Sequence, residues 1–369
     1  MNLAVFLTRG MSLAKWAKGG VLGRELALYE RLALEGVSTT FVSWGGRDEA
    51  RHLKDRPKLA VAANVLGLSR EWYERLLPLL HARVFRRAHI IKTNQMDGAD
   101  VALRCSRVWR TPLLARCGFM WSEFRRLQGL EDEASRAAGI EARVYAQAAG
   151  GVVTTRQMLD YLVQRHGVRE DKLRVIPNYV PEAFFAENRG PGRGKPVILA
   201  LGRFSGQKNL VALVRACQGL DATLRLIGQG DLKDDLAALA GELGVDVEMP
   251  GKIPHELLPG EIAAADVFAQ VSLYEGHPKT LLEAMACGAA IVASDGPGVG
   301  GVVEHGRTAL VCGTDSASIH DGLKRLLQDP DLRSRLGREA RRQARAEFAL
   351  GVVAEKELRV YTDILERKK

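Results

Sequence analysis

The first half of the chain opens with an order of elements that restricts its fold. A short apolar run at residues 3–7 leads into a glycine-containing loop that ends at Gly19 and Gly20. A segment with apolar residues at helical spacing follows over 22–33, and a second apolar run lies at 40–44. A strand, a loop, a helix and another strand form a βαβ unit, which is the building block of a parallel, doubly wound sheet.

The second half repeats this order. An apolar run at 197–201 precedes a loop over 202–208, a helical segment over 209–217 and a further strand at 224–227, which ends in the glycines Gly228 and Gly230. The alternation of strand and helix continues beyond this point. The fold class that we expect is therefore α/β, with two Rossmann-like, doubly wound parallel-sheet domains.

The division between the two halves is marked by composition. The chain has 369 residues, which is too long for one ordinary core, and Asn188–Pro196 (NRGPGRGKP) is typical of an exposed linker. We expect a first domain over 1–187, the linker over 188–196 and a second domain over 197–349. The last segment, 350–369, is predicted to be a helix that packs on the first domain with one apolar stripe, formed by Leu350, Ala354, Leu358, Tyr361 and Leu365.

Several classes of protein are disfavoured by composition. No apolar run approaches the roughly 18 residues of a membrane-spanning helix, and the first residues do not resemble a secretory signal, so a cytoplasmic location is expected. The five cysteines lack CxxC spacing and are expected to be free thiols. No set of Cys and His residues has metal-ligand spacing, so no metal is predicted.

The net charge is unevenly distributed. Of the overall +9, residues 1–185 carry +10 (29 Lys and Arg against 19 Asp and Glu), and the remainder carries −1. A basic half favours an anionic partner such as a membrane surface, although a solvated Arg-rich surface explains it about as well. The segment 70–87 has one apolar stripe at helical spacing among five arginines, interrupted by Pro78; the stripe consists of Tyr73, Leu76, Leu77, Leu80 and Val84. This pattern fits either a core-facing helix, which we favour, or a membrane-surface helix.

Two cations follow the first strand of the second half. Arg203 lies directly after it and Lys208 five residues later. Ligands of doubly wound sheets bind beyond the carboxyl ends of the strands, so both side chains are expected near a bound ligand. A forked guanidinium and a compact ammonium together can neutralise a diphosphate, whereas either cation alone is more often an ordinary loop residue.

Two carboxylates lie eight positions apart in the segment EGHPKTLLEAMACG. Glu275 is predicted in the loop after a strand and Glu283 in the following helix, where each can accept hydrogen bonds from sugar hydroxyls. The backbone N–H groups of residues 276–281 lie at the start of that helix and can add further donors. Solvated carboxylates are the alternative, which the apolar setting of Glu283 makes less favourable.

The segment from Glu275 to Gly288 resembles the signature of glycosyltransferase family four, whose members are retaining enzymes with the GT-B fold. Five further segments match the family's pattern in the same order, and the match covers most of the second half and the edges of the first. These segments are KGG at Lys18–Gly20, IPN at Ile176–Asn178, LGRF with Lys208, and IGQGDL at Ile227–Leu232 together with ADVFAQVSLYEG at Ala265–Gly276.

The resemblance implies a role for each matching residue. Arg203 and Lys208 would hold the diphosphate of a nucleotide-sugar donor, Glu283 the ribose and Glu275 the transferred sugar. Gly19 and Gly20 would let backbone approach the phosphates. The full set of donor-binding residues that it implies is Gly19, Gly20, Arg203, Lys208, Gly228, Gly230, Glu275, Gly276, His277, Pro278, Lys279, Thr280, Leu281 and Glu283.

One position departs from the family's pattern. Many members carry a histidine after a strand of the first domain, close to the reacting carbon, whereas LLARCG over 113–118 has Cys117 there, preceded by Arg116. A thiol is a weaker hydrogen-bonding group than imidazole, so Arg116 is the catalytic candidate on this side, beside Glu275, Arg203 and Lys208. The candidates for contact with the acceptor are Asn94, Gln95, Asp97 and Cys117, with loop capping as the alternative for Asn94 and Asp97.

The sequence thus predicts a metal-independent, retaining hexosyltransferase that uses a nucleoside-diphosphate sugar and no cofactor. The expected acceptor is a saccharide or glycolipid of cell-surface polysaccharide or lipopolysaccharide assembly, with an anionic inner membrane face as a further candidate partner. A nicotinamide-dependent oxidoreductase is disfavoured because no GxGxxG follows a first strand. An inactive sugar-nucleotide-binding protein is a second alternative, and a nucleic-acid-binding protein is disfavoured because no reader motif is present.

Overall fold

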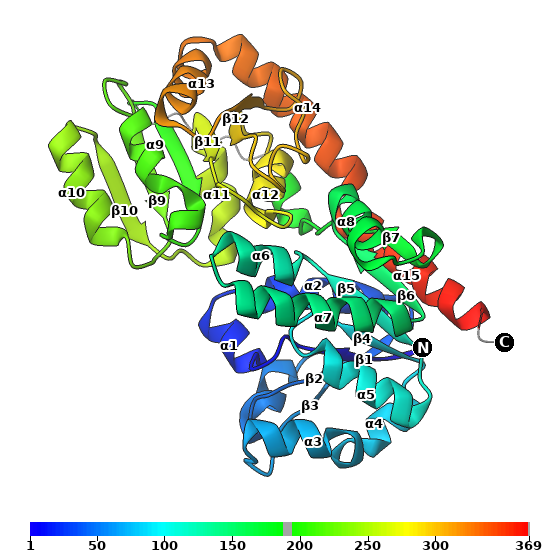
Figure 1. Ribbon diagram of the computed structural model, residues 1–369. Helices are drawn as coiled ribbons and strands as arrows, with labels where there is room; N and C mark the ends of the chain where they lie inside the picture. Colours follow the sequence, from blue (N-terminus) through cyan, green and yellow to red (C-terminus); the bar gives the residue numbers. More distant parts are fainter. Residues whose placement is uncertain (187–193, 368–369) are drawn as a thin grey trace. The chain divides into compact units, whose positions relative to one another are not determined.

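The computed structural model describes residues 1–186 and 194–367, which fall into two compact units (Figure 1). Unit 1 contains Met1–Asn178 together with Leu350–Lys369, and unit 2 contains Tyr179–Ala349. The predicted linker at 188–196 lies largely outside the described residues. Each unit has its own parallel sheet and its own hydrophobic core, as expected for a separate domain.

Unit 1 is built on a seven-stranded sheet in the order β3-β2-β1-β4-β5-β6-β7, and every strand pair is parallel. The strands are β1 (Asn2–Phe6), β2 (Ser38–Val42), β3 (Leu59–Ala62), β4 (Ile90–Thr93), β5 (Leu113–Cys117), β6 (Gly150–Val153) and β7 (Leu173–Val175). The helices and short 3-10 segments are α1 (Leu13–Lys18), α2 (Leu22–Leu34), η1 (Arg47–Leu53), α3 (Arg70–Leu80), α4 (Ala82–Arg87), α5 (Ala99–Trp109), α6 (Trp121–Leu127), α7 (Glu131–Gln147), α8 (Arg156–His166), η2 (Glu170–Lys172) and α15 (Leu350–Glu366).

Unit 2 is built on a six-stranded sheet in the order β10-β9-β8-β11-β12-β13, which is also parallel throughout. The strands are β8 (Val197–Leu201), β9 (Thr223–Ile227), β10 (Val247–Gly251), β11 (Val267–Gln270), β12 (Ile291–Ser294) and β13 (Leu310–Cys312). The helices and 3-10 segments are η3 (Glu182–Phe185), η4 (Gly206–Lys208), α9 (Leu210–Ala216), α10 (Lys233–Leu243), η5 (His255–Leu257), α11 (Leu258–Ala263), α12 (Lys279–Ala286), α13 (Ser316–Gln328) and α14 (Pro330–Glu347).

The strand order reverses direction once in each sheet, between β1 and β4 in unit 1 and between β8 and β11 in unit 2. In doubly wound sheets this switch point opens a crevice at the carboxyl ends of the strands, where ligands bind. The expected α/β class with two Rossmann-like units is therefore confirmed. The two switch points are the places in each unit where a functional site is to be sought.

The stretch before Gly19 is more ordered than predicted. We expected a loop from the first strand to the two glycines, whereas residues 13–18 form α1. Ser12 caps this helix by accepting a hydrogen bond from the Lys15 N–H, and the buried Glu49 carboxylate accepts from the N–H groups of Leu13 (2.7 Å) and Ala14 (3.1 Å). These partners satisfy N–H groups that a six-residue helix leaves open, and they stabilise its first turn.

Residues 179–186 group with unit 2, although we placed them in the first domain. The N–H of Val180 donates to the carbonyl of Phe348 (2.8 Å), and the Arg341 guanidinium donates to the carbonyl of Phe185 (2.5 Å). Phe184 and Phe185 are both buried. The segment therefore belongs to unit 2 because its hydrogen bonds and apolar contacts are made there.

The terminal helix α15 belongs to unit 1, but its buried face differs from the predicted stripe. Leu350, Leu358 and Leu365 are only partly buried, whereas Glu357 is fully buried. Its carboxylate accepts a hydrogen bond from Lys92 Nζ at 2.6 Å, and Lys92 itself is fully buried on β4. The charged side chain could turn inward because a cation from a distant strand meets it there.

Candidate functional site

The switch point of unit 2 brings together two residues that the sequence places 67 positions apart. Lys208, at the end of η4, lies after β8, and Glu275 follows β11. The Lys208 ammonium donates to Glu275 Oε1 at 2.5 Å, and the two side chains keep 17% and 12% of their surface exposed. A cation and a carboxylate are thus available at one position on the carboxyl edge of the sheet.

The backbone after β8 is shaped so that Lys208 can reach this position. Gly202 has a φ of +148°, and a Cβ added there would lie 3.0 Å from Cε of Lys208. Asn209 follows Lys208 with a φ of +55°, a left-handed conformation that asparagine tolerates better than most residues. The glycine therefore provides both the backbone conformation and the space for the lysine side chain.

Gly228 and Gly230 lie against this same loop. A Cβ on Gly228 would lie 1.7 Å from the carbonyl oxygen of Gly202, and one on Gly230 would lie 2.2 Å from that of Phe204. Phe204 N–H donates to the carbonyl of Gln229 at 2.9 Å. In this structure the two glycines allow the loops after β8 and β9 to pack closely.

Arg203 lies between these packed residues but faces outward. Its side chain is exposed, and it makes no hydrogen bond or ion pair with the residues that the structure describes. An exposed guanidinium at the carboxyl end of β8 is available to bind an anion from solvent. An anion-binding pair with Lys208 stays a prediction, and in this structure the Lys208 ammonium is bonded to Glu275.

Glu275 is held by contacts that sequence reasoning did not identify. Ser272 Oγ donates to Glu275 Oε1 (2.9 Å), and the Glu275 N–H donates to the carbonyl of Pro297 (2.8 Å). The loop after β12 packs so closely here that a Cβ on Gly298, whose φ is +75°, would lie 2.0 Å from the Glu275 carbonyl oxygen. The glycine-rich run DGPGVGG at 295–301 was the available signal, because repeated glycines after a strand indicate close backbone packing.

The start of α12 divides the predicted residues 276–281 into two groups. Thr280 Oγ1 donates to Gln270 Oε1 at 3.0 Å, which places it beside the β11 end, and Lys279 is partly exposed. By contrast, Leu281 is fully buried and its N–H donates to the Pro278 carbonyl at 3.1 Å. Leu281 is therefore a core residue with no N–H left for a ligand, and this part of the prediction was wrong.

Three more predicted residues lie close to Glu275 in the chain. His277 and Pro278 are buried, with the His277 ring centroid 5.7 Å from that of Phe348, whereas Gly276 is partly exposed. The first turn of α12 has no side-chain cap. Of this group, Gly276 is the residue whose position best allows contact with a ligand from solvent.

Glu283 occupies a more enclosed position than we expected. Its side chain is 1% exposed, and its Oε1 lies 2.8 Å from His255 Nε2. The His255 ring lies 5.1 Å from the ring of Phe184. A ligand hydroxyl that binds Glu283 would have to share or replace the histidine, because that partner already occupies one carboxylate oxygen.

At the start of unit 1, Gly19 and Gly20 form the turn between α1 and α2. Gly19 caps α1 at its carboxyl end, and Gly20 has a φ of +70° with no heavy atom within 4 Å of an added Cβ. The conformation at Gly20 favours glycine, and the space around it is open. The N–H groups of both glycines already have partners, since Gly19 donates to the Lys15 carbonyl (2.9 Å) and Gly20 to the Ala17 carbonyl (3.0 Å). The contact of this turn with a phosphate therefore stays a prediction.

Arg116 is tied into the interior of unit 1. It is 9% exposed, and its guanidinium donates to the carbonyl of Asn94 (3.3 Å) and to Oδ1 of Asn178 (3.0 Å), while its Nε lies 3.9 Å from a Glu357 carboxylate oxygen. These contacts use part of the guanidinium that we named as a catalytic candidate, and the catalytic role stays a prediction. In this structure Arg116 joins the ends of β4 and β5 to α15.

Cys117 does not fit its predicted role as an acceptor contact. Its side chain is fully buried and its thiol donates to the carbonyl of Phe119. Burial raises the pKa of this thiol, and the nearby Glu141 adds to the rise. A neutral, enclosed thiol belongs to the core of unit 1, and the position at which the resemblance led us to expect a histidine is here a packing position.

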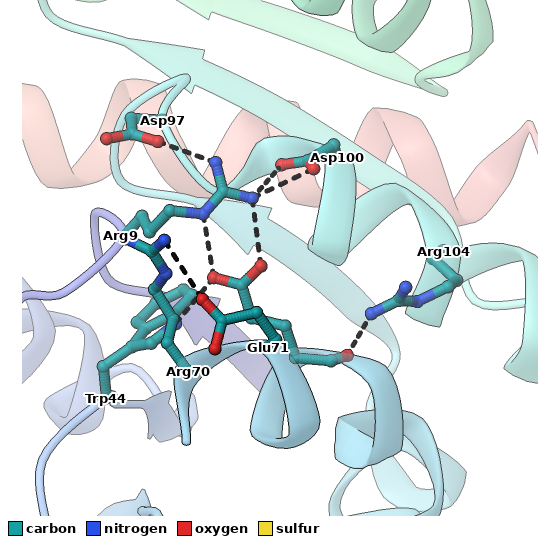
Figure 2. Close-up of polar contacts among 8 residues, drawn as sticks. Arg9, Trp44, Arg70, Glu71, Asp97, Asp100 and Arg104 are labelled. Carbon is teal, nitrogen blue, oxygen red and sulfur yellow. Dashed lines mark hydrogen bonds and ion pairs between the residues drawn. The ribbon is translucent and has the colours of Figure 1, made fainter.

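The other acceptor candidates border an ion-pair network at the end of β4 (Figure 2). Gln95 Oε1 accepts a hydrogen bond from the Gly118 N–H (2.8 Å), and the Asp97 carboxylate accepts one from Arg9 Nη1 (2.9 Å). Arg9 also contacts Glu74 at 2.8 Å and Asp100 at 2.8 Å. Burial raises the pKa of Asp97 although Arg9 opposes the rise. Asn94 and Gln95 are partly exposed, so they remain acceptor candidates by position.

Comparison with known proteins identifies the two units. The family model described as Glycosyltransferase Family 4 matches residues 19–184, and the model described as Glycosyl transferases group 1 matches residues 183–343. The two matches together span most of both units in the expected order. The chain belongs to glycosyltransferase family four.

Curated relatives of this glycosyltransferase are identical to it at about a third of the aligned positions or fewer. The D-inositol 3-phosphate glycosyltransferase of Pseudarthrobacter chlorophenolicus is 28% identical over 74% of this chain and 70% of its own length. The alpha-D-kanosaminyltransferase of Streptomyces kanamyceticus is 28% identical over 46% of each chain. The GDP-mannose-dependent alpha-(1-6)-phosphatidylinositol monomannoside mannosyltransferase of Mycolicibacterium smegmatis is 34% identical over 45% of this chain. This chain spans about half the length of the last two relatives (46% and 47%).

Solved structures show the same fold. Sucrose-phosphate synthase from Thermosynechococcus elongatus superposes with a TM-score of 0.81 at 21% identity over the whole of both chains. Anabaena HepE in complex with UDP and glucose superposes with a TM-score of 0.76 at 18% identity, over 98% of this chain and 100% of that one. The GT-B fold expected from the resemblance is thereby confirmed for this glycosyltransferase.

Proposed function

We propose that this glycosyltransferase moves a hexose from a nucleoside-diphosphate donor to an acceptor hydroxyl and retains the anomeric configuration. The observation that carries the proposal is the placement of Lys208, Glu275 and the outward-facing Arg203 at the switch point of unit 2. Two cations suit a diphosphate, and a carboxylate beside them suits the hydroxyls of the attached sugar.

In this reaction Lys208 and Arg203 would stabilise negative charge on the leaving group. As the bond between the anomeric carbon and the diphosphate breaks, negative charge grows on the phosphate oxygens, so contacts with Lys208 and Arg203 strengthen in the transition state. The acceptor oxygen attacks from the same face, and its proton passes to the departing diphosphate. This route needs no protein nucleophile, and with two protein cations on the diphosphate it needs no metal ion.

Glu275 and Glu283 are assigned to the two sugars of the donor. Glu275 would accept hydrogen bonds from the transferred sugar, with Lys208 moving from the carboxylate to the phosphates as the donor binds. Glu283 would accept from the ribose, with His255 as the partner that orients it at 2.8 Å. In this proposal the ion pair between Lys208 and Glu275 keeps both side chains in place before the donor arrives.

The acceptor is proposed to be a saccharide or glycolipid of cell-surface polysaccharide or lipopolysaccharide assembly at the inner face of the membrane. Support comes from the mycobacterial relative, whose name gives it a phosphatidylinositol mannoside as its acceptor, and from the basic first half. No described helix is long and apolar enough to cross a bilayer. Acceptor contacts would come from unit 1, where Asn94 and Gln95 remain partly exposed at the end of β4.

The test combines binding and turnover. A panel of nucleotide sugars should raise the unfolding temperature of the wild-type chain for one donor, because a ligand at about 100 times its Kd stabilises the folded state by roughly 2.7 kcal/mol. With that donor, Lys208→Ala should lower kcat/KM by at least about 100-fold, the usual effect of losing one charge-stabilising contact.

A matched control removes a cation that lies away from the site. Arg342→Ala on α14 deletes an exposed side chain paired with Glu339 and should leave kcat/KM unchanged. Wild-type turnover in Lys208→Ala would contradict the proposal. Donor binding without turnover for any acceptor would favour the alternative of an inactive sugar-nucleotide-binding protein.

A further inference from the structure

Helix α3 of unit 1 carries two apolar faces. The inner face, with Tyr73 and Leu77, is 1% and 0% exposed and belongs to the core. The outer face carries Trp72, which is 56% exposed, and Leu79, which is 70% exposed, with the partly exposed Leu76 between them. Positions 72, 76 and 79 share one side of a helix, so these side chains form a continuous apolar stripe toward solvent.

Exposed arginines lie on α3 beside this stripe and on the helix that follows it. Arg75 lies on the same side of α3, with its guanidinium 5.6 Å from the centre of the Trp72 ring. The short helix α4 continues directly after α3 and exposes Arg83, Arg86 and Arg87. We call the exposed side chains of α3 and α4 the α3–α4 face, defined by Trp72, Arg75, Leu76, Leu79, Leu80, Arg83, Arg86 and Arg87.

The acidic residues of α3 do not offset this charge. Glu74 turns toward the interior, where its carboxylate pairs with Arg9 (2.8 Å) and accepts from Trp44 Nε1 (3.2 Å). Glu71 pairs with the neighbouring Arg70 at 3.3 Å, as Figure 2 shows. The α3–α4 face is therefore both apolar and strongly basic.

Single exposed apolar side chains are common on soluble proteins and need no explanation. Here a tryptophan and two leucines share one helical face, and four of the five arginines on the two helices belong to the α3–α4 face. Helices with this composition bind at the boundary between the headgroups and the acyl chains of a bilayer, with arginines at the lipid phosphates. A second copy of the chain is a poorer occupant, because a two-fold contact would set these arginines against their own copies.

We infer that the α3–α4 face docks on an anionic phospholipid bilayer. Trp72, Leu76 and Leu79 enter the headgroup boundary, and the four arginines contact the lipid phosphates. This inference deepens the proposed function, since a lipid-linked acceptor is reached from the membrane surface. The docking itself requires neither donor nor turnover, so it can be tested independently.

The experiment is co-sedimentation of the full chain with vesicles of phosphatidylcholine alone or with about 30% phosphatidylglycerol. The wild type should pellet with the anionic vesicles at about 0.05 M salt and be released at about 0.5 M, where screening is short-ranged. It should stay in solution with the neutral vesicles. Trp72 fluorescence should shift to shorter wavelength on binding, and the Trp72→Phe variant should lack most of that shift.

Two variants test the apolar part and the basic part of the α3–α4 face separately. Trp72→Gln with Leu79→Gln removes the apolar stripe, and Arg83→Gln with Arg86→Gln and Arg87→Gln removes the charge of α4. Each should lower the partition coefficient at least about 10-fold. All of these side chains are exposed, so the unfolding temperature should stay at the wild-type value.

Matched controls place the same changes elsewhere. Leu34→Gln with Leu257→Gln removes two leucines that are 78% and 57% exposed, and Arg335→Gln with Arg338→Gln and Arg342→Gln removes three exposed arginines of α14. Both control variants should bind like the wild type.

Three outcomes would overturn the inference: no wild-type binding to anionic vesicles at low salt, equal loss in the controls, or self-association in solution that Trp72→Gln with Leu79→Gln abolishes. Stabilisation by a nucleotide sugar should persist in every one of these variants. Failure of docking with donor binding intact would therefore leave the proposed function standing, and loss of donor binding in the wild type would not affect the docking.

Discussion

At the residue scale, the donor side depends on how closely two backbone loops approach. Gly202 and Gly228 bring the ends of β8 and β9 together, and this packing positions Lys208 beside Glu275. The role of these glycines is steric, since a side chain at either position would meet backbone or the lysine. A conservative change there should therefore affect both stability and the site.

Gly228→Ala tests this packing. The new Cβ would lie 1.7 Å from the Gly202 carbonyl oxygen, and the φ of +156° disfavours alanine as well. We expect a loss of about 3 kcal/mol in the free energy of unfolding, measured by urea denaturation.

The matched control is Gly241→Ala in α10. An added Cβ there has no heavy atom within 4 Å, and alanine favours a helix more than glycine does. This variant should be stabilised by about 0.5–1 kcal/mol. A Gly228→Ala variant as stable as the wild type would show that the loops can separate without cost.

At the scale of elements, α15 is attached to the sheet of unit 1 by a buried ion pair as well as by apolar packing. Lys92 Nζ donates to Glu357 (2.6 Å) and to the Tyr361 hydroxyl (2.9 Å). Burial lowers the pKa of Lys92 to about 8, although Glu357 opposes this. Such a pair is sensitive to loss of one partner, because the remaining charge stays buried.

The pair can be tested by a double-mutant cycle. Lys92→Met should destabilise the chain by about 3–5 kcal/mol, since Glu357 is then left without its ammonium. Adding Glu357→Leu should restore much of that loss, because an apolar pair of similar size removes the buried charge. Urea denaturation of the wild type, the two single variants and the double variant measures the coupling. Additive losses would mean that the two side chains do not act as a pair.

The same pair predicts a pH dependence. Burial would raise the pKa of Glu357, but Lys92 and Arg116 outweigh it and hold this pKa below the ordinary value of 4.5. Between the two values the unfolded state binds more protons, so the stability from Glu357 is complete above about pH 4.5 and is lost as pH falls through the folded pKa.

The measurement is the free energy of unfolding between about pH 3 and pH 6 for the wild type and Glu357→Gln. The variant should be less stable at the upper end and should lose less on acidification. The wild-type curve should be steeper than that of the variant over this range, with one proton, about 1.4 kcal/mol per pH unit, as the upper limit of the difference. Parallel curves would show that Glu357 does not contribute to acid sensitivity.

At the scale of the whole molecule, the two units have separate cores and carry different candidate binding sites. Unit 2 holds the predicted donor residues other than Gly19 and Gly20, whereas the positive charge of the chain and the α3–α4 face belong to unit 1. The division predicts that ligands of different chemistry should protect different parts of the chain.

Amide hydrogen exchange of the full chain can separate these effects. A bound nucleoside diphosphate should slow exchange most at 202–208 and 272–283, because the phosphate and ribose contacts are proposed there. The α3–α4 segment should be unchanged by the nucleotide. Protection confined to unit 1 would contradict the assignment of the donor site.

The sequence by itself determined the fold class and its two α/β units, and it predicted a set of donor residues. Arg203, Lys208 and Glu275 follow apolar runs, and the carboxyl ends of parallel strands meet at one edge, so their position near a single site followed from local pattern alone.

Only the tertiary structure decided which polar side chains are enclosed. Cys117 and Glu357 lie in the core, Arg116 is bound by carbonyl and amide groups, and α3 has a second apolar face toward solvent. The reason is physical: a charge can be buried only where a partner compensates it, and Lys92 is 265 positions from Glu357. No local pattern contains such a pair, because the fold alone brings the two residues together.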